Sequence, residues 1–312
     1  MKKRLQNKIA ESRFSLPITA LFAVLVCFAC GLWQDRLWIQ FVGLAISALL
    51  MVQLNNSNAL LRIYSRMVSC AFLVLCSVAC FLFPSISGAV VMVCMTACYV
   101  TFFHAYQDKH ASGRIFYTFI FIGIASIPFI QIVFFIPILW ILLATNIMAF
   151  SWKSFFASIF GLIVPYWFAG GYYFLQEDID TFVNHFTDIT VFQPLFDYSQ
   201  INEHQIVTFI FIAILALVGI VHFLRNSYKD KIKTRMLFEV FIVMDICSFV
   251  FIILQPQHYD FLMRIMIINT APLIAHFVAL TRTWFTNAFF GLICLAAIAI
   301  TAYNLWISSL IF

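Results

Sequence analysis

The sequence predicts an all-helical fold, a polytopic bundle of about eleven transmembrane helices with short loops, forming a single membrane domain over residues 1–312. Two observations lead to this prediction. First, 64% of the residues are apolar and 10% are charged, against roughly 45–50% and about 25% in soluble domains. Second, the apolar residues form separate runs, most of them near the roughly 20 residues that cross a bilayer as a helix. A soluble enzyme, a secreted disulfide scaffold and a nucleic-acid-binding protein are therefore excluded.

The chain begins with a basic stretch, residues 1–13, which leads into an apolar run from Ser15 to Trp33. This run is longer than the apolar core of a cleaved signal peptide, and the polar turn 34–36 leads directly into a second run. We therefore expect an uncleaved first helix. The expected spans cover residues 15–33, 37–54, 67–84, 88–106, 115–128, 132–150, 155–175, 206–224, 236–255, 261–280 and 285–309.

Residues 116–150 decide the number of spans. A single helix of this length would extend about 52 Å, far beyond a hydrocarbon core of about 30 Å. Pro128 and Pro137 interrupt it, so we expect two segments divided near 128–131, either as two full spans or as a re-entrant hairpin. With two segments and a cytoplasmic N-terminus, all of the 18 Lys and Arg residues except Arg36 and Arg264 fall on the inner side. This topology places the C-terminus outside.

One loop, residues 176–205, is long and lies outside in this topology. It contains no Lys or Arg, and its apolar residues Phe182, Val183, Phe186 and Ile189 recur at helical spacing. We expect a short amphipathic helix on the outer leaflet, and a membrane or periplasmic protein partner is a candidate to bind through residues 180–196. The carboxylates of this acidic segment are Glu177, Asp178, Asp180, Asp188, Asp197 and Glu203.

Asp245 is the polar residue that most requires an explanation, because it falls midway along the expected span 236–255. A charge at this depth costs about 2.5–3.5 kcal/mol even on the insertion scale. Asn269 and Thr270 lie at the same depth in the antiparallel span 261–280. Two interpretations stay open, a structural hydrogen bond between helices and a transport or proton-handling role. Pro165 and Pro272 add a weak indication of discontinuous helices, which transporters use for substrate sites.

Arg36 and Arg264 are the two basic residues on the outer side, and each has an acidic neighbour, Asp35 and Asp260. Local charge neutralisation explains both pairs. The alternative is an outer-leaflet phosphate site, since a guanidinium binds phosphate oxygens in a bidentate fork. A lipid phosphate is then the candidate ligand.

The histidines fall into an inner layer (His104, His222 and His276) and an outer layer (His185, His204 and His258). His276 is kept as a candidate binding residue. No histidine-box spacing occurs, and the nine cysteines lie in apolar runs without accompanying metal ligands. Motifs for ATP, dinucleotides and catalytic serines are absent from the sequence. We therefore expect no metal, no cofactor and no nucleic-acid partner, and we assign no catalytic residue.

Three stretches, residues 52–70, 134–174 and 258–277, resemble the recurring blocks of a multi-pass inner-membrane family of the Bacteroidota, a domain of unknown function. The resemblance implies a bacterial inner (cytoplasmic) membrane protein of about this size. It implies no activity, so no functional residue is transferred.

Three functional hypotheses follow. The favoured one is a non-enzymatic scaffold or partner subunit, because the loops are short and one acidic amphipathic segment faces outward. The second is a transporter or lipid translocator that uses the mid-membrane carboxyl of Asp245. The third is an enzyme that acts on a lipid-phosphate substrate at the outer leaflet.

Overall fold

The computed structural model describes residues 4–192 and 194–311, and within these residues all regular structure is helical. The all-helical prediction is confirmed, but the described residues form 13 α-helices instead of about eleven. The two that the sequence did not predict as spans are short. In chain order the helices are α1 (Leu5–Glu11), α2 (Ser15–Ala29), α3 (Trp38–Asn58), α4 (Met67–Val78), α5 (Ile86–His104), α6 (Ser112–Ser126), α7 (Ile136–Thr145), α8 (Trp152–Leu175), α9 (Ile179–Thr187), α10 (Glu203–Asn226), α11 (Ile232–Leu254), α12 (Tyr259–Leu280) and α13 (Trp284–Ile311).

Among the described residues, seven helical segments are long and apolar enough to cross a membrane, those of α3, α5, α8, α10, α11, α12 and α13. An eighth is possible if α1 and α2, which are bent by 89° at their junction, form one span. The helices α4, α6 and α7 are apolar but shorter. For example, the 12 residues of α4 extend about 18 Å. Residues 79–84, expected to prolong this helix, instead form a turn and a 3-10 segment, η1 (Cys80–Leu82), before Pro84.

The prolines act differently from one another. The predicted division near Pro128 is confirmed, because α6 ends at Ser126 and a 3-10 segment, η2 (Ile130–Phe135), leads into α7. Pro137 lies in the first turn of α7, where the missing N–H costs no intrahelical bond. Pro165 and Pro272 lie inside the continuous helices α8 and α12, so the suggested discontinuity at these two prolines is wrong.

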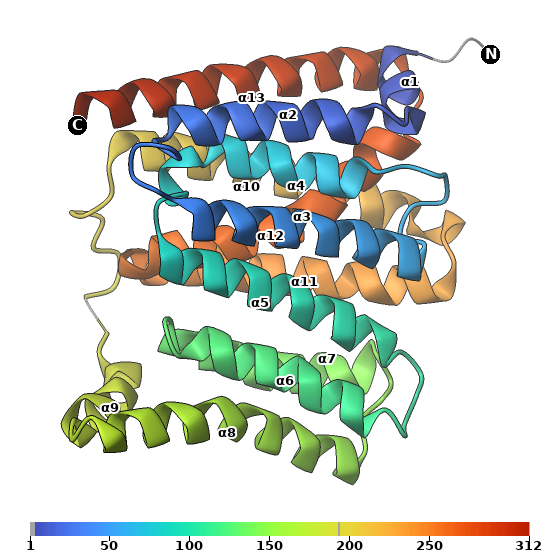
Figure 1. Cartoon of the computed structure of the whole chain (residues 1–312). Coiled ribbons are helices and arrows are strands. Elements are labelled where there is room, and N and C mark those ends of the chain that lie inside the picture. Colours follow the sequence, from blue (N-terminus) through green and yellow to red (C-terminus); the bar gives the residue numbers. More distant parts are fainter. Residues whose placement is uncertain (1–3, 193, 312) are drawn as a thin grey trace.

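The helix α12 forms the centre of the bundle, and nearly all of its side chains are buried. It packs against α4, α5, α10 and α11, which surround it in Figure 1. Gly219 of α10 permits one of these close contacts, because a Cβ at this position would lie 2.8 Å from the carbonyl carbon of Leu273. The helix α12 is therefore the most deeply buried of the seven span-length helices among the described residues.

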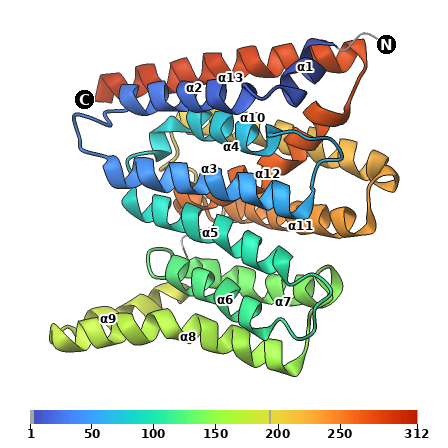
Figure 2. The same cartoon turned by 45° about the vertical axis from the view of Figure 1, so that its right-hand side comes forward.

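Successive long helices run in opposite directions, so the loops gather at two ends of the bundle (Figures 1 and 2). One end of the bundle contains most of the Lys and Arg residues, and we call it the basic end. It holds the N-terminus and the loops 59–66, 105–111, 146–151, 227–231 and 281–283. The opposite end holds the acidic segment 176–205, and we call it the acidic end.

The predicted amphipathic helix in the acidic segment is confirmed as α9. It packs on α8, where Phe182 covers Gly170 and the ring of Phe186 lies 5.1 Å from the ring of Tyr166. Ile189, expected to extend the helix, lies in the 3-10 turn η3 (Asp188–Thr190).

Candidate functional site

The mid-depth residues form one buried polar cluster. Thr270 of α12 donates a hydrogen bond to Oδ1 of Asp245 on α11, at 3.2 Å. Its neighbour Asn269 accepts a hydrogen bond from the hydroxyl of Tyr99 on α5, at 2.6 Å between oxygens. All four side chains are at most 2% exposed. Asp245 and Thr270 thus form a hydrogen bond, as their common depth suggests. Tyr99 is a further member of the cluster that the sequence did not predict.

This cluster is closed by aromatic side chains. The ring of Tyr99 packs edge-on against Phe241 at 5.3 Å and lies 5.8 Å from Phe103. Among the described residues, Asp245 lines none of five cavities with volumes of about 40 to 630 Å³. The arrangement ties α5, α11 and α12 together, because a buried polar group is costly without a hydrogen-bond partner.

A second cluster at the basic end was not predicted as a unit. Asp230, in the loop before α11, lies 2.6 Å from Nε of Arg62 and 3.1 Å from Nε2 of His276. The side chains of Asp230 and His276 have no exposed surface. Because an ionised carboxylate only accepts hydrogen bonds, Nε2 of His276 must carry the donated proton. The ring of His222 lies 5.4 Å from that of His276, whereas His104 of the same predicted layer is not part of this cluster.

Asp230, like Tyr99, was not predicted from the sequence. A signal existed, because it is the single acidic residue between Arg225 and Arg235. Its partner Arg62 precedes α4, far away in the sequence, and no periodicity links the two. The cluster fixes loop 227–231 onto the α3–α4 connection and the last turns of α12.

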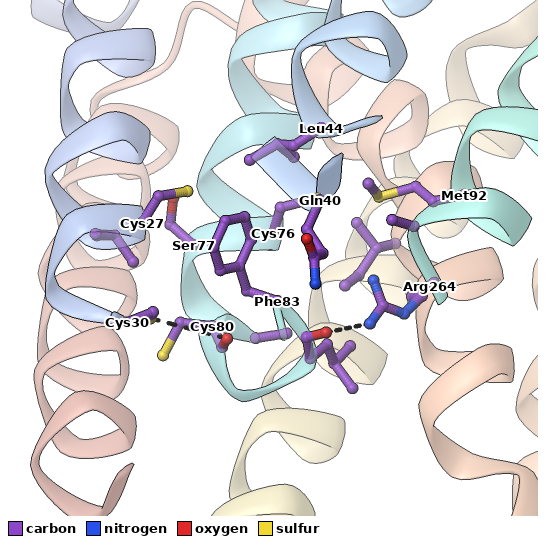
Figure 3. A pocket seen from close by; sticks show the side chains of 15 residues that line it. Cys27, Cys30, Gln40, Leu44, Cys76, Ser77, Cys80, Phe83, Met92 and Arg264 are labelled. Carbon is purple, nitrogen blue, oxygen red and sulfur yellow. Dashed lines mark hydrogen bonds between the residues drawn. The ribbon is translucent and has the colours of Figure 1, made fainter. Parts of the chain in front are cut away.

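No hydrogen bond or ion pair joins Arg264, Arg36 and Asp260 to one another among the described residues, so the structure does not test the predicted phosphate site. Arg264 is 5% exposed because it lies on the central helix, and its guanidinium donates to the carbonyl oxygen of Leu82. It lines a cavity of about 40 Å³ together with Gln40 and Cys76 (Figure 3). Arg36 is exposed in the α2–α3 loop, and Asp260, also exposed, forms no ion pair with Arg264 in the described chain.

The acidic end contains a polar cavity of about 220 Å³ beneath the acidic segment. His185 and Asp188 from the segment face Gln131 before α7 and His258 before α12. The outer histidines predicted as one layer therefore separate, because His204 packs instead against Phe81 at 5.1 Å. No group of three or more His, Cys, Asp or Glu residues suited to a metal ion occurs in the part of the chain that the structure describes.

The acidic segment is held firmly over this cavity. Gln131 donates a hydrogen bond to the backbone carbonyl of Asp188 at 3.2 Å, and the hydroxyl of Tyr198 donates to the carbonyl of Ile253 at 3.0 Å. The ring of Phe192 lies 5.7 Å from that of Phe134. Several apolar side chains nevertheless remain more than half exposed, namely Val183, Val191, Phe192, Leu195 and Phe196.

The chain matches no protein-family model, no curated protein and no solved structure. The resemblance to a Bacteroidota membrane family stays a prediction.

Proposed function

We propose that this chain is a non-enzymatic multi-pass protein of the bacterial inner membrane, serving as a scaffold or partner subunit whose acidic segment binds a basic region of a membrane or periplasmic protein. The observation that carries this proposal is the combination, on one anchored segment, of exposed apolar side chains and uncompensated carboxylates. Exposed apolar patches with a polar rim are typical of protein interaction sites. A binding partner that supplies Lys or Arg would complement the charge.

The distribution of charge supports the orientation in this proposal. Cytoplasmic loops carry an excess of Lys and Arg. The basic end would accordingly face the cytoplasm, with the N-terminus, and the acidic segment would face outward. This orientation corresponds to eleven crossings, in which the shorter helices α4, α6 and α7 also pass between the two ends.

The polar cavity gives the partner a specific point of attachment. Asp188, His185, His258 and Gln257 line this cavity of about 220 Å³. Carboxylate, imidazole and side-chain amide groups all contain atoms that accept hydrogen bonds. A Lys or Arg side chain of the partner fits this chemistry, and the exposed apolar residues beside it would cover the stem of that side chain.

Replacing Asp188 by lysine should weaken partner binding at least about tenfold, because the cavity would then repel a basic side chain. Asp188→Lys and wild-type protein would be purified from membranes under identical conditions, and the co-purifying proteins quantified by mass spectrometry. Asp197→Lys makes the same change in charge in the same segment but outside the cavity, so it should weaken partner binding less than Asp188→Lys does. An unchanged set of co-purifying proteins in Asp188→Lys would contradict the proposal.

The mid-depth cluster separates this proposal from the transporter alternative. Asparagine at position 245 keeps an oxygen that accepts from Thr270, so Asp245→Asn should change the free energy of unfolding by less than about 1 kcal/mol and leave partner binding unchanged. Thermal unfolding in detergent and co-purification measure both. A folded Asp245→Asn protein that has lost activity in cells would favour transport through a carboxyl at this position.

A further inference from the structure

A large apolar cavity lies between α2 and α13 in the half of the bundle nearest the basic end. Its volume is about 470 Å³, within the range of ligand-binding cavities. Its floor comes from α4, α10 and α12, through residues such as Cys70, Ala71 and Ala275. Both α2 and α13 pack against α4 (Figures 1 and 2). Residues of all three helices line the cavity.

The short helix α1 covers the basic end of this cavity. Lys8, Ile9 and Ser12 contribute to the lining. Two side chains hold α1 in place, since Nε2 of Gln6 donates to the carbonyl of Val278 at 2.6 Å and Nδ2 of Asn7 donates to the carbonyl of Thr281 at 2.9 Å. The helix α1 therefore lies at the basic end of the cavity, with the exposed Lys8 in its lining.

The lining combines an apolar wall with one charge. Lys8 is the single charged residue that lines the cavity, and it is exposed and forms no ion pair with another residue of the described chain. The hydroxyl of Thr19 donates a hydrogen bond to the carbonyl of Ser15, and the hydroxyl of Ser15 donates to the carbonyl of Ile9. A ligand in this cavity would therefore contact the ammonium group of Lys8 and otherwise mainly apolar side chains.

The depth of the cavity matches part of one leaflet. On α4 the lining runs from Met67 to Leu75, which corresponds to about 12 Å along the helix axis. One leaflet contributes about half of a hydrocarbon core of about 30 Å. A ligand with its charged group at Lys8 would thus place its apolar part at the depth of acyl chains.

We infer that this cavity binds one acyl chain of an anionic phospholipid from the leaflet at the basic end, with the lipid phosphate beside Lys8. Such a site is separate from the acidic segment and does not depend on the proposed partner. A Lys near the membrane surface contributes about 1 kcal/mol toward an anionic lipid, which corresponds to about fivefold in binding.

A second groove provides a control within the same molecule. It has a volume of about 260 Å³, lies between α2 and α3, and is lined by apolar residues without any charge, Ala45 among them. Lipid in this groove should show no preference for a charged headgroup.

Native mass spectrometry of the purified protein, with equal amounts of phosphatidylglycerol and phosphatidylcholine added, tests the inference. Wild-type protein should retain phosphatidylglycerol preferentially, and Lys8→Gln should lower the ratio of the two bound lipids about fivefold. Ala71→Trp should reduce retention of both lipids, whereas Ala45→Trp should leave retention at this site unchanged. Lys8 is exposed, so the Lys8→Gln result stands even if Ala71→Trp does not fold.

Equal retention of the two lipids by wild-type protein would overturn the inference. So would an unchanged lipid ratio in Lys8→Gln, or a preference for added free fatty acid over phosphatidylglycerol. Failure of the Asp188→Lys experiment would leave this result untouched, because the two sites lie at opposite ends of the bundle.

Discussion

Replacing Arg62 by glutamine is expected to lower the free energy of unfolding by about 1–3 kcal/mol. The carboxylate of Asp230 has no exposed surface, and Arg62 is the cation that lies 2.6 Å from it. Removing one partner of a buried ion pair leaves an uncompensated charge, which costs about 3–5 kcal/mol in a fully buried pair. The side chain of Arg62 is 35% exposed, so water already screens part of this interaction and the lower range applies.

Thermal unfolding in detergent measures this effect, and Arg66→Gln is the matched control. Arg66 lies at the end of the same loop, and its guanidinium contacts the exposed hydroxyl of Tyr64 at 3.4 Å. In an Asp230→Asn background, Arg62→Gln should cost much less, because the buried charge is already gone. Equal losses in the two backgrounds would show that Arg62 stabilises the protein independently of Asp230.

Replacing Gly161 by leucine is expected to destabilise the contact between α6 and α8 by about 3 kcal/mol. A Cβ at this position would lie 2.5 Å from the carbonyl oxygen of Phe116 and 3.1 Å from the Cβ of Phe119. These neighbours are a backbone atom and the base of a side chain, and neither can move without separating the helices. Overpacking of a close interface costs about 1–3 kcal/mol and occasionally more.

Gly171→Leu provides the comparison in the same helix. Nothing lies within 4 Å of a Cβ at Gly171, so leucine there should be neutral or slightly stabilising. Both variants would be expressed, purified and melted in the same detergent. A Gly161→Leu protein as stable as Gly171→Leu would show that α6 and α8 are not packed as described.

The sequence was informative about helices and less so about their lengths. Hydrophobicity located every long helix, because the bilayer imposes an apolar composition on the whole segment. It overestimated α4, since residues 79–84 are as apolar as the helix but turn before Pro84. It missed α1, whose buried residues Gln6 and Asn7 are polar and form hydrogen bonds with Val278 of α12 and with Thr281, which follows α12.

For the candidate site, the sequence predicted the depth of residues along their helices but not which helices lie next to each other. Depth along a helix can be counted in residues, and it placed Asp245 beside Thr270 correctly. Which helices are neighbours does not follow from counting residues along the sequence. The partners Tyr99, which bonds to Asn269, and Asp230, which bonds to His276, were therefore missed. For the same reason Arg36 and Arg264, both on the outer side by count, turned out to be exposed in one case and buried in the other.

The acidic segment can meet a periplasmic partner only if it lies on the opposite side of the membrane from loop 227–231. One additional cysteine would be introduced into the full chain, either Ser199→Cys or Tyr228→Cys, and intact cells would be treated with a membrane-impermeant maleimide. The labelling of wild-type protein, which comes from the native cysteines, would be subtracted. We expect Ser199→Cys to react in intact cells and Tyr228→Cys to react only after permeabilisation. Reaction of both cysteines in intact cells, or of Tyr228→Cys alone, would contradict the orientation on which the proposed function depends.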